Sequence, residues 1–173
     1  GETGFGFQGG GPMFRATTET VRPGQDGPAF YKGVEVTTPP DSDDICGQDI
    51  ALITLEGAGI PESVTKPIVP RIDSRPDPGE EFSAIGYGLT DPNNQESSGT
   101  RMRLDGNQVS CLGGTCGGAL GGSDKDTEWL GDAPTCPGDS GGPAIDSLGR
   151  VTGVLSRGPQ GCLGSVFGDV SLW

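Results

Sequence analysis

No histidine occurs among the 173 residues of this sequence, so the usual general base at neutral pH and the most common metal ligand are both missing. Lysine and arginine number only 11 against 24 aspartates and glutamates, and no basic cluster exists that would neutralise the phosphates of a nucleic acid. No apolar run approaches the roughly 20 residues needed to span a bilayer. We therefore expect neither a nucleic-acid partner nor a membrane span.

Helical periodicity is also scarce, whereas glycine and proline are abundant, with 33 and 15 residues. The glycines follow no repeat, which excludes collagen, and the apolar residues form short clusters between turns. This pattern predicts a turn-dense all-β protein built as a sandwich or as barrels. Residues 50–55 (IALITL) form a continuous apolar run, which is typical of a strand buried on both faces. The other expected strands are residues 13–22, 30–38, 81–87, 101–110, 143–147, 150–156 and 165–170.

Residues 57–79 contain five prolines and little strand pattern. We interpret this segment as a linker between two sub-domains, residues 1–56 and residues 80–173. The acidic stretches 91–99 and 123–132 lack the spacing of a calcium-binding loop, so we interpret them as solvated turns.

The five cysteines fit no zinc site, because neither a histidine nor a second close pair completes one. We expect two disulfides instead, Cys111–Cys116 across a glycine-rich loop and Cys136–Cys162 between distant segments. Cys46 lies outside both bridges, which suggests a partner beyond this chain or a thiol. Disulfides indicate an oxidising, secreted setting. No metal and no organic cofactor is expected.

Residues 136–143 read Cys-Pro-Gly-Asp-Ser-Gly-Gly-Pro and place Ser140 among glycines. Small neighbours allow a substrate backbone to approach, and they allow the tight turn that exposes a hydroxyl. Backbone N–H groups around such a turn can converge on a developing oxyanion. A bare Gly-x-Ser-x-Gly is more often an ordinary surface turn, but the eight-residue string is far more specific.

Residues 138–143 (GDSGGP) resemble the serine motif of the chymotrypsin/trypsin family of serine proteases. Three further segments resemble motifs of that family and occur in its order. They are residues 49–53 (DIALI), similar to the catalytic aspartate that leads into an apolar strand; residues 86–88 (GYG), similar to Gly-Trp-Gly; and residues 153–158 (GVLSRG), similar to the substrate-pairing strand. Cys136 and Cys162 resemble the disulfide beside the specificity pocket. The resemblance covers about residues 14–173 and implies an all-β fold, the chymotrypsin-like double antiparallel β-barrel.

The nucleophile elbow of α/β-hydrolases also reads Gly-x-Ser-x-Gly, but it requires a helix after the serine and a later histidine. Here Pro143 and strand-like sequence follow Ser140. The acid Asp49 precedes the serine, as in the chymotrypsin order. The elbow is therefore excluded.

The resemblance implies a role for each matched residue. Ser140 would be the nucleophile that forms an acyl-enzyme, and Asp49 would be the carboxylate that orients a histidine. The N–H groups of Gly138 and Ser140 would form the oxyanion hole. Asp139 would support the oxyanion loop by pairing with the amino terminus that zymogen cleavage creates.

In the family, the histidine precedes the catalytic aspartate by a few tens of residues. We interpret this sequence as a protease fragment, in which residues 1–56 are a remnant of the amino-terminal barrel and carry Asp49. Residues 80–173 would be the carboxy-terminal barrel, which carries Ser140 and lacks the terminal helix. The histidine is then expected on a missing amino-terminal segment, and the chain alone is expected to be nearly inert. The alternative is a catalytically dead, protease-like module that binds proteins through its cleft.

The floor of the primary specificity pocket lies six residues before the nucleophile in the family, which is Pro134 here, followed by Thr135. Neither residue can pair with a substrate Lys or Arg, so an uncharged residue is expected before the scissile bond. Ser156, Arg157 and Gly158 would line the pocket entrance and pair with the backbone of a protein or peptide substrate. Arg157 stands where the family has an aromatic residue. The resemblance as a whole implies a secreted, trypsin-like serine endopeptidase.

Overall fold

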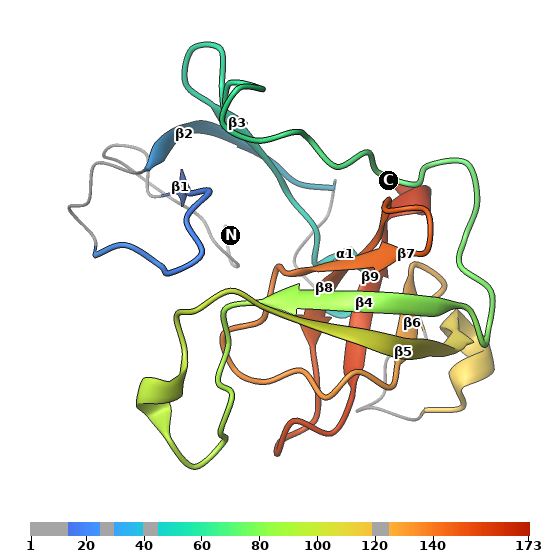
Figure 1. The fold of residues 1–173 in the computed structure, drawn as a ribbon. Helices are drawn as coiled ribbons and strands as arrows, with labels where there is room; N and C mark the ends of the chain where they lie inside the picture. Colours follow the sequence, from blue (N-terminus) through green and yellow to red (C-terminus); the bar gives the residue numbers. More distant parts are fainter. Residues whose placement is uncertain (1–13, 25–29, 40–44, 119–124) are drawn as a thin grey trace, which may run out of the picture.

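The computed structural model describes residues 14–24, 30–39, 45–118 and 125–173, and it divides into an open sheet and a closed barrel (Figure 1). The open sheet has the order β1-β2-β3 and contains β1 (Arg15–Ala16), β2 (Tyr31–Thr37) and β3 (Leu52–Leu55). The barrel has the order β4-β5-β6-β9-β8-β7 and contains β4 (Glu81–Gly86), β5 (Met102–Leu112), β6 (Glu128–Gly131), β7 (Pro143–Asp146), β8 (Val151–Arg157) and β9 (Ser165–Asp169). Neighbouring strands pair antiparallel in both parts.

Helical structure is limited to single turns within the described ranges. These are α1 (Ile45–Gln48) and the 3-10 turns η1 (Gln95–Ser97), η2 (Gly113–Cys116) and η3 (Val170–Leu172). Within the same ranges, no helix has the length and apolarity that crossing a membrane would require.

An aromatic triple fills the centre of the barrel. Trp129 stacks on Phe167 with ring centroids 4.3 Å apart, and Phe82 meets the edge of both rings at 5.1 and 5.4 Å. Alternate residues of a strand point to one face, so β4, β6 and β9 each deliver one ring to the interior. Burial of these three rings gives the barrel a large apolar contribution to its stability.

Most of the expected strands are present, with two differences. Residues 13–22 supply only the two-residue β1 and an isolated bridge between Val21 and Thr100, with Met13 outside the described residues. The stretch 123–132, interpreted as an acidic turn, contains β6, which pairs with β5 and β9 and closes the barrel. The interpretation of residues 128–131 as part of a turn is therefore wrong.

The apolar run at residues 50–55 does contain β3, but the expectation that both its faces are buried is wrong. Leu52 is 73% exposed and Ile53 is 44% exposed. Across the ladder, Val36 on β2 lies opposite Ile53 and is itself 40% exposed. A strand is buried on both faces only where a layer covers each face, and the described residues place none over these side chains.

Two arginines fasten the proline-rich segment to the barrel. The guanidinium of Arg71 pairs with Glu80 and lies 3.8 Å from the carboxylate of Asp146 on β7. Arg75 Nε donates to Asp169 Oδ2 at 2.6 Å, and Asp169 on β9 is fully buried. The segment therefore has fixed contacts along its second half. Figure 1 shows its path from β3 to β4. The division of the chain into residues 1–56, 57–79 and 80–173 remains a prediction.

Both expected disulfides are formed, one between Cys111 and Cys116 and the other between Cys136 and Cys162. Cys46 belongs to neither bridge. The first disulfide closes η2 onto the end of β5, and the second joins the segment before Ser140 to the turn before β9.

Candidate active site

Ser140 lies on a tight turn between β6 and β7, and its side chain is exposed. Two backbone hydrogen bonds hold the turn to β8: Gly141 N–H donates to the carbonyl of Leu155 at 2.7 Å, and Leu155 N–H donates to the carbonyl of Gly142 at 2.8 Å. Gly138 and Gly141 have φ angles of +98° and +82°, which side-chain-bearing residues rarely adopt. The glycines around Ser140 are therefore required by the turn itself.

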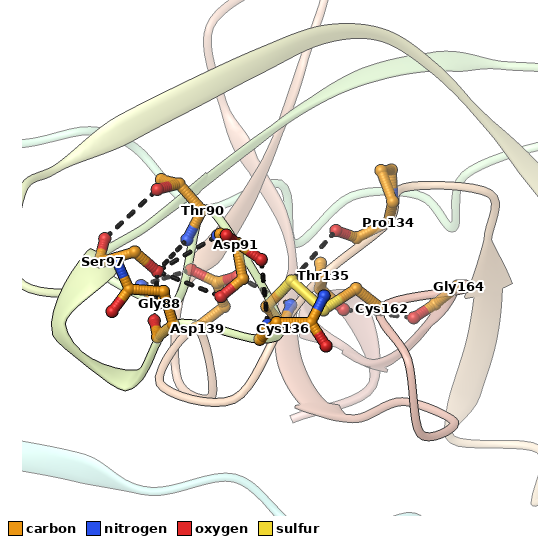
Figure 2. Close-up of a disulfide and its surroundings, with 12 residues drawn as sticks. Gly88, Thr90, Asp91, Ser97, Pro134, Thr135, Cys136, Asp139, Cys162 and Gly164 are labelled. Carbon is orange, nitrogen blue, oxygen red and sulfur yellow. Dashed lines mark hydrogen bonds between the residues drawn. A yellow bond between two sulfur atoms is a disulfide. The ribbon is translucent and has the colours of Figure 1, made fainter.

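The carboxylate of Asp139 binds two backbone amides. Its Oδ1 accepts from Gly88 N–H at 2.7 Å, and its Oδ2 accepts from Cys136 N–H at 2.9 Å. Figure 2 shows Asp139 close to Gly88 and beside the Cys136–Cys162 disulfide. One side chain thus connects the residues before Ser140 to the end of β4. The expected pairing of Asp139 with a new amino terminus remains a prediction.

Asp49 lies between α1 and β3, and its carboxylate reaches the barrel. Ser156 Oγ donates to Asp49 Oδ2 at 2.7 Å, and Ser156 is buried on β8. Ser156 directly follows Leu155, the residue that holds the turn of Ser140. Strand β8 therefore brings the segment of Asp49 and the turn of Ser140 to neighbouring positions, although the two residues are far apart in sequence.

Arg157 follows Ser156 and forms a bidentate pair with Glu128 of β6, with N–O distances of 2.7 and 3.0 Å. Glu128 is only 2% exposed, and its Oε1 also accepts from the N–H of Gly47 at 2.7 Å. The carboxylate of Glu128 raises the pKa of the Arg157 guanidinium above its usual value, because hydrogen bonding to the charged form outweighs the opposing effect of burial. The α1 segment that precedes Asp49 is thus tied to the barrel wall.

The residues expected to form the specificity pocket come from two segments that the Cys136–Cys162 disulfide joins (Figure 2). Thr135 Oγ1 donates to the carbonyl of Gly164 at 3.1 Å, and Pro134 next to it is exposed. A Cβ on Gly158 would lie 2.6 Å from the same carbonyl oxygen, so only glycine fits there without a shift. The structure therefore brings Pro134, Thr135 and Gly158 to one place beside Gly164.

Comparison with known proteins identifies the family. The family model described as Trypsin matches residues 11–170, nearly the whole chain. The chain belongs to the trypsin family. Its structure is similar to that of neuropsin, a serine protease expressed in the limbic system of mouse brain. That similarity has a TM-score of 0.70 and 20% sequence identity, and it covers 83% of this chain and 68% of neuropsin. No curated protein matches the chain.

The expected chymotrypsin-like fold is confirmed by this structural similarity, with one closed barrel and an open sheet in the described residues. Membership of the trypsin family implies a serine peptidase that acts on peptide substrates. The two disulfides are consistent with a secreted member of the family.

The trypsin-family motifs did not indicate two residues that the structure places beside Asp49, namely Glu128 and Gly47. Glu128 is a single acid at the start of a four-residue strand, and nothing in its local sequence pairs it with Arg157. Gly47 has a φ of +89°, and a Cβ there would collide with the side chain of Lys125. The only sequence signal for Gly47 is its position three residues after the acidic run 41–44, and this signal is weak.

Replacing Gly88 by alanine is expected to lower kcat of the active trypsin-family enzyme about 10²-fold, the loss associated with one misplaced oxyanion-hole donor. The new Cβ would lie 2.5 Å from Cγ of Asp139, so the carboxylate must move and the turn of Gly138 and Ser140 must move with it. Steady-state kinetics of peptide hydrolysis measures this loss. G24A is the matched control, because the Cβ position of Gly24 has no neighbour within 4 Å. Equal kinetics for G88A and G24A would contradict the role of Asp139 in holding the turn.

Proposed function

We propose that this trypsin-family domain is the nucleophile-bearing part of a secreted serine endopeptidase that cleaves protein or peptide chains through an acyl-enzyme at Ser140. The observation that carries the proposal is the hydrogen bond that Ser156 donates to Asp49. Ser156 lies on β8, the strand whose Leu155 also holds the turn of Ser140. A carboxylate bonded to the strand that also holds an exposed serine on a glycine turn supports acyl transfer by a serine triad.

Each residue has a distinct part in the proposed reaction. Ser140 Oγ attacks the scissile carbonyl, and the N–H groups of Gly138 and Ser140 stabilise the oxyanion that forms. The proton passes to an imidazole, which the Asp49 carboxylate orients and stabilises in its protonated form. Because the 173 residues contain no histidine, we place that imidazole on polypeptide outside this sequence, on a segment amino-terminal to Asp49. The oxyanion intermediate then collapses, the scissile C–N bond breaks, and the imidazolium gives its proton to the departing amine, which is the first product. Water, deprotonated by the imidazole, attacks the resulting acyl-enzyme and releases the second product.

The proposed specificity follows from the uncharged residues of the pocket. Pro134 and Thr135 offer no carboxylate to a Lys or Arg side chain, so the residue before the scissile bond is expected to be uncharged and of modest size. The backbone of Ser156, Arg157 and Gly158 would pair with the substrate as an added strand.

Labelling with a fluorophosphonate probe tests the proposed function, because the probe reacts only with a serine whose proton has an acceptor. The full-length gene product is expected to become labelled at Ser140, and mass spectrometry of the tryptic peptides locates the adduct. The 173-residue chain alone is expected to label very slowly, since loss of one triad member removes most of the rate enhancement.

The S140A variant of the full-length product is the control and must stay unlabelled. A full-length product that contains a histidine before Asp49, folds, and still leaves Ser140 unmodified would refute the proposal. It would favour the alternative, a protease-like module that binds proteins without cleaving them.

A further inference from the structure

A partly buried ion pair, Arg157 with Glu128, lies next to Ser156, whose hydroxyl donates to the carboxylate of Asp49. Glu128 holds both terminal nitrogens of Arg157, and the pair links β6 to β8 across β9, which lies between the two strands. Arg157 Nη1 is also 3.2 Å from Ser156 Oγ, the hydroxyl that donates to Asp49. The guanidinium therefore has two carboxylates within its neighbourhood and is bound to only one of them.

Electrostatic attraction and hydrogen-bond geometry decide which of the two carboxylates, Glu128 or Asp49, binds the Arg157 guanidinium. Arginine forms its strongest contacts as a bidentate pair with one carboxylate, and Glu128 already provides this geometry. The titratable groups that face Arg157 are Glu128 from β6, with Cys46 and Asp49 from the α1 segment. If Glu128 were neutral, Asp49 would be the remaining carboxylate among these three groups, and the guanidinium would move toward it.

We propose that Glu128 is a positioning residue for Asp49, which it serves by holding the guanidinium of Arg157 away from the Asp49 carboxylate and by anchoring Gly47. The second contact fixes the backbone two residues before Asp49, since Gly47 N–H donates to Glu128 Oε1 and Thr127 Oγ1 donates to the carbonyl of Gly47. The proposal rests on the proposed function, because it gives Asp49 its part in orienting an imidazole.

Because Glu128 binds Arg157, no guanidinium neutralises the negative charge of the Asp49 carboxylate. A carboxylate stabilises the protonated imidazole that forms during acyl transfer, and an arginine bound to that carboxylate would cancel much of this effect. An imidazole facing a neutralised Asp49 has a lower pKa than one facing a free carboxylate. Loss of Glu128 therefore has a signature beyond weaker activity, namely a shift of the acid limb of the pH–rate profile to lower pH.

The kinetic test compares the full-length enzyme with its E128Q and E128Q/R157Q variants, using E81Q as the control at an exposed strand position. We expect E128Q to lower kcat at least tenfold and to move the acid limb of kcat/KM down by about one pH unit. E128Q/R157Q removes the guanidinium together with its counter-charge, so its acid limb is expected to return to the wild-type position. An E128Q enzyme with an unmoved acid limb, or a double variant no different from E128Q, would overturn the proposal.

A structural test does not depend on activity and uses the full-length protein. A crystal structure of the E128Q chain is expected to show the Arg157 guanidinium within 4 Å of the Asp49 carboxylate, the range of a salt bridge. If Arg157 keeps its place beside residue 128, the proposal fails whatever the enzyme does. If the wild-type enzyme never labels at Ser140, the proposed function fails. The crystal structures then still show whether Glu128 keeps Arg157 away from Asp49. Should E128Q not fold, E128D is compared instead: it keeps the charge, so Arg157 is expected to stay paired with residue 128, and a guanidinium that moves to Asp49 in E128D would overturn the proposal.

Discussion

Replacing Asp49 by asparagine is expected to lower kcat for peptide hydrolysis by about 10⁴-fold, the loss that this change causes in serine proteases with a triad. Asparagine keeps the shape of the side chain and can still accept from Ser156 Oγ, as the Asp49 carboxylate does at 2.7 Å. It removes the negative charge, however, and its amide favours the wrong tautomer of the imidazole. KM is expected to change little, because asparagine preserves the hydrogen bond that holds Ser156, whose backbone would pair with the substrate.

The measurement is steady-state hydrolysis of a peptide by the full-length enzyme, with the fold of D49N checked by circular dichroism. D77N is the matched control, since Asp77 is exposed on the proline-rich segment and its side chain lies outside the site. A loss of tenfold or less for a folded D49N enzyme would show that Asp49 is not the carboxylate of a triad.

Replacing Trp129 by alanine is expected to destabilise the barrel by about 3–5 kcal/mol, the usual cost of deleting a large buried aromatic side chain. Trp129 is fully buried and touches both other rings of the aromatic triple, so its loss leaves a cavity between β4, β6 and β9. A domain of this size has about 5–15 kcal/mol of stability in total, and the variant would retain a small margin or none.

Thermal and urea unfolding followed by circular dichroism measures this loss. W129F keeps one aromatic ring and removes an indole N–H that finds no acceptor among the described residues, so its loss is expected to be much smaller. W173A is the surface control, because Trp173 is 49% exposed. Similar unfolding midpoints for W129A and W173A would show that the barrel core is not organised around Trp129.

The hairpin of β7 and β8 shows what short-range sequence can predict. Its strands are runs of apolar and β-branched residues, and Gly149, with a φ of +79°, ends the turn between them. The Ser140 turn is similar, because the glycines that its backbone requires stand next to one another in the sequence. Such features depend on neighbouring residues, and a single sequence contains all of them.

Strands β3 and β6 show where the sequence was insufficient. β6 begins with a glutamate, and Glu128 is buried only because Arg157, 29 positions later, neutralises it. β3 is as apolar as a buried strand, yet Leu52 remains exposed because burial depends on what covers a face. Both outcomes were decided by residues distant in sequence, which local pattern and propensity do not describe.

The contact between Asp49 and Ser156 has the same origin, since 107 positions separate the two residues. No spacing rule connects an aspartate before one strand to a serine at the end of another. The family resemblance pointed to both residues, and the structure supplied the hydrogen bond between them. Glu128 has no counterpart among the recognised motifs, and only the structure placed it beside this pair.

Asp49 lies on a segment outside the barrel, and that segment is joined to β6 and β8 by a few hydrogen bonds of Thr127, Glu128 and Ser156. Local opening of such a segment requires less free energy than melting of the core. Warming would therefore release the carboxylate while the aromatic interior stays folded. Heat inactivation would then precede the loss of tryptophan packing, and it would reverse on cooling.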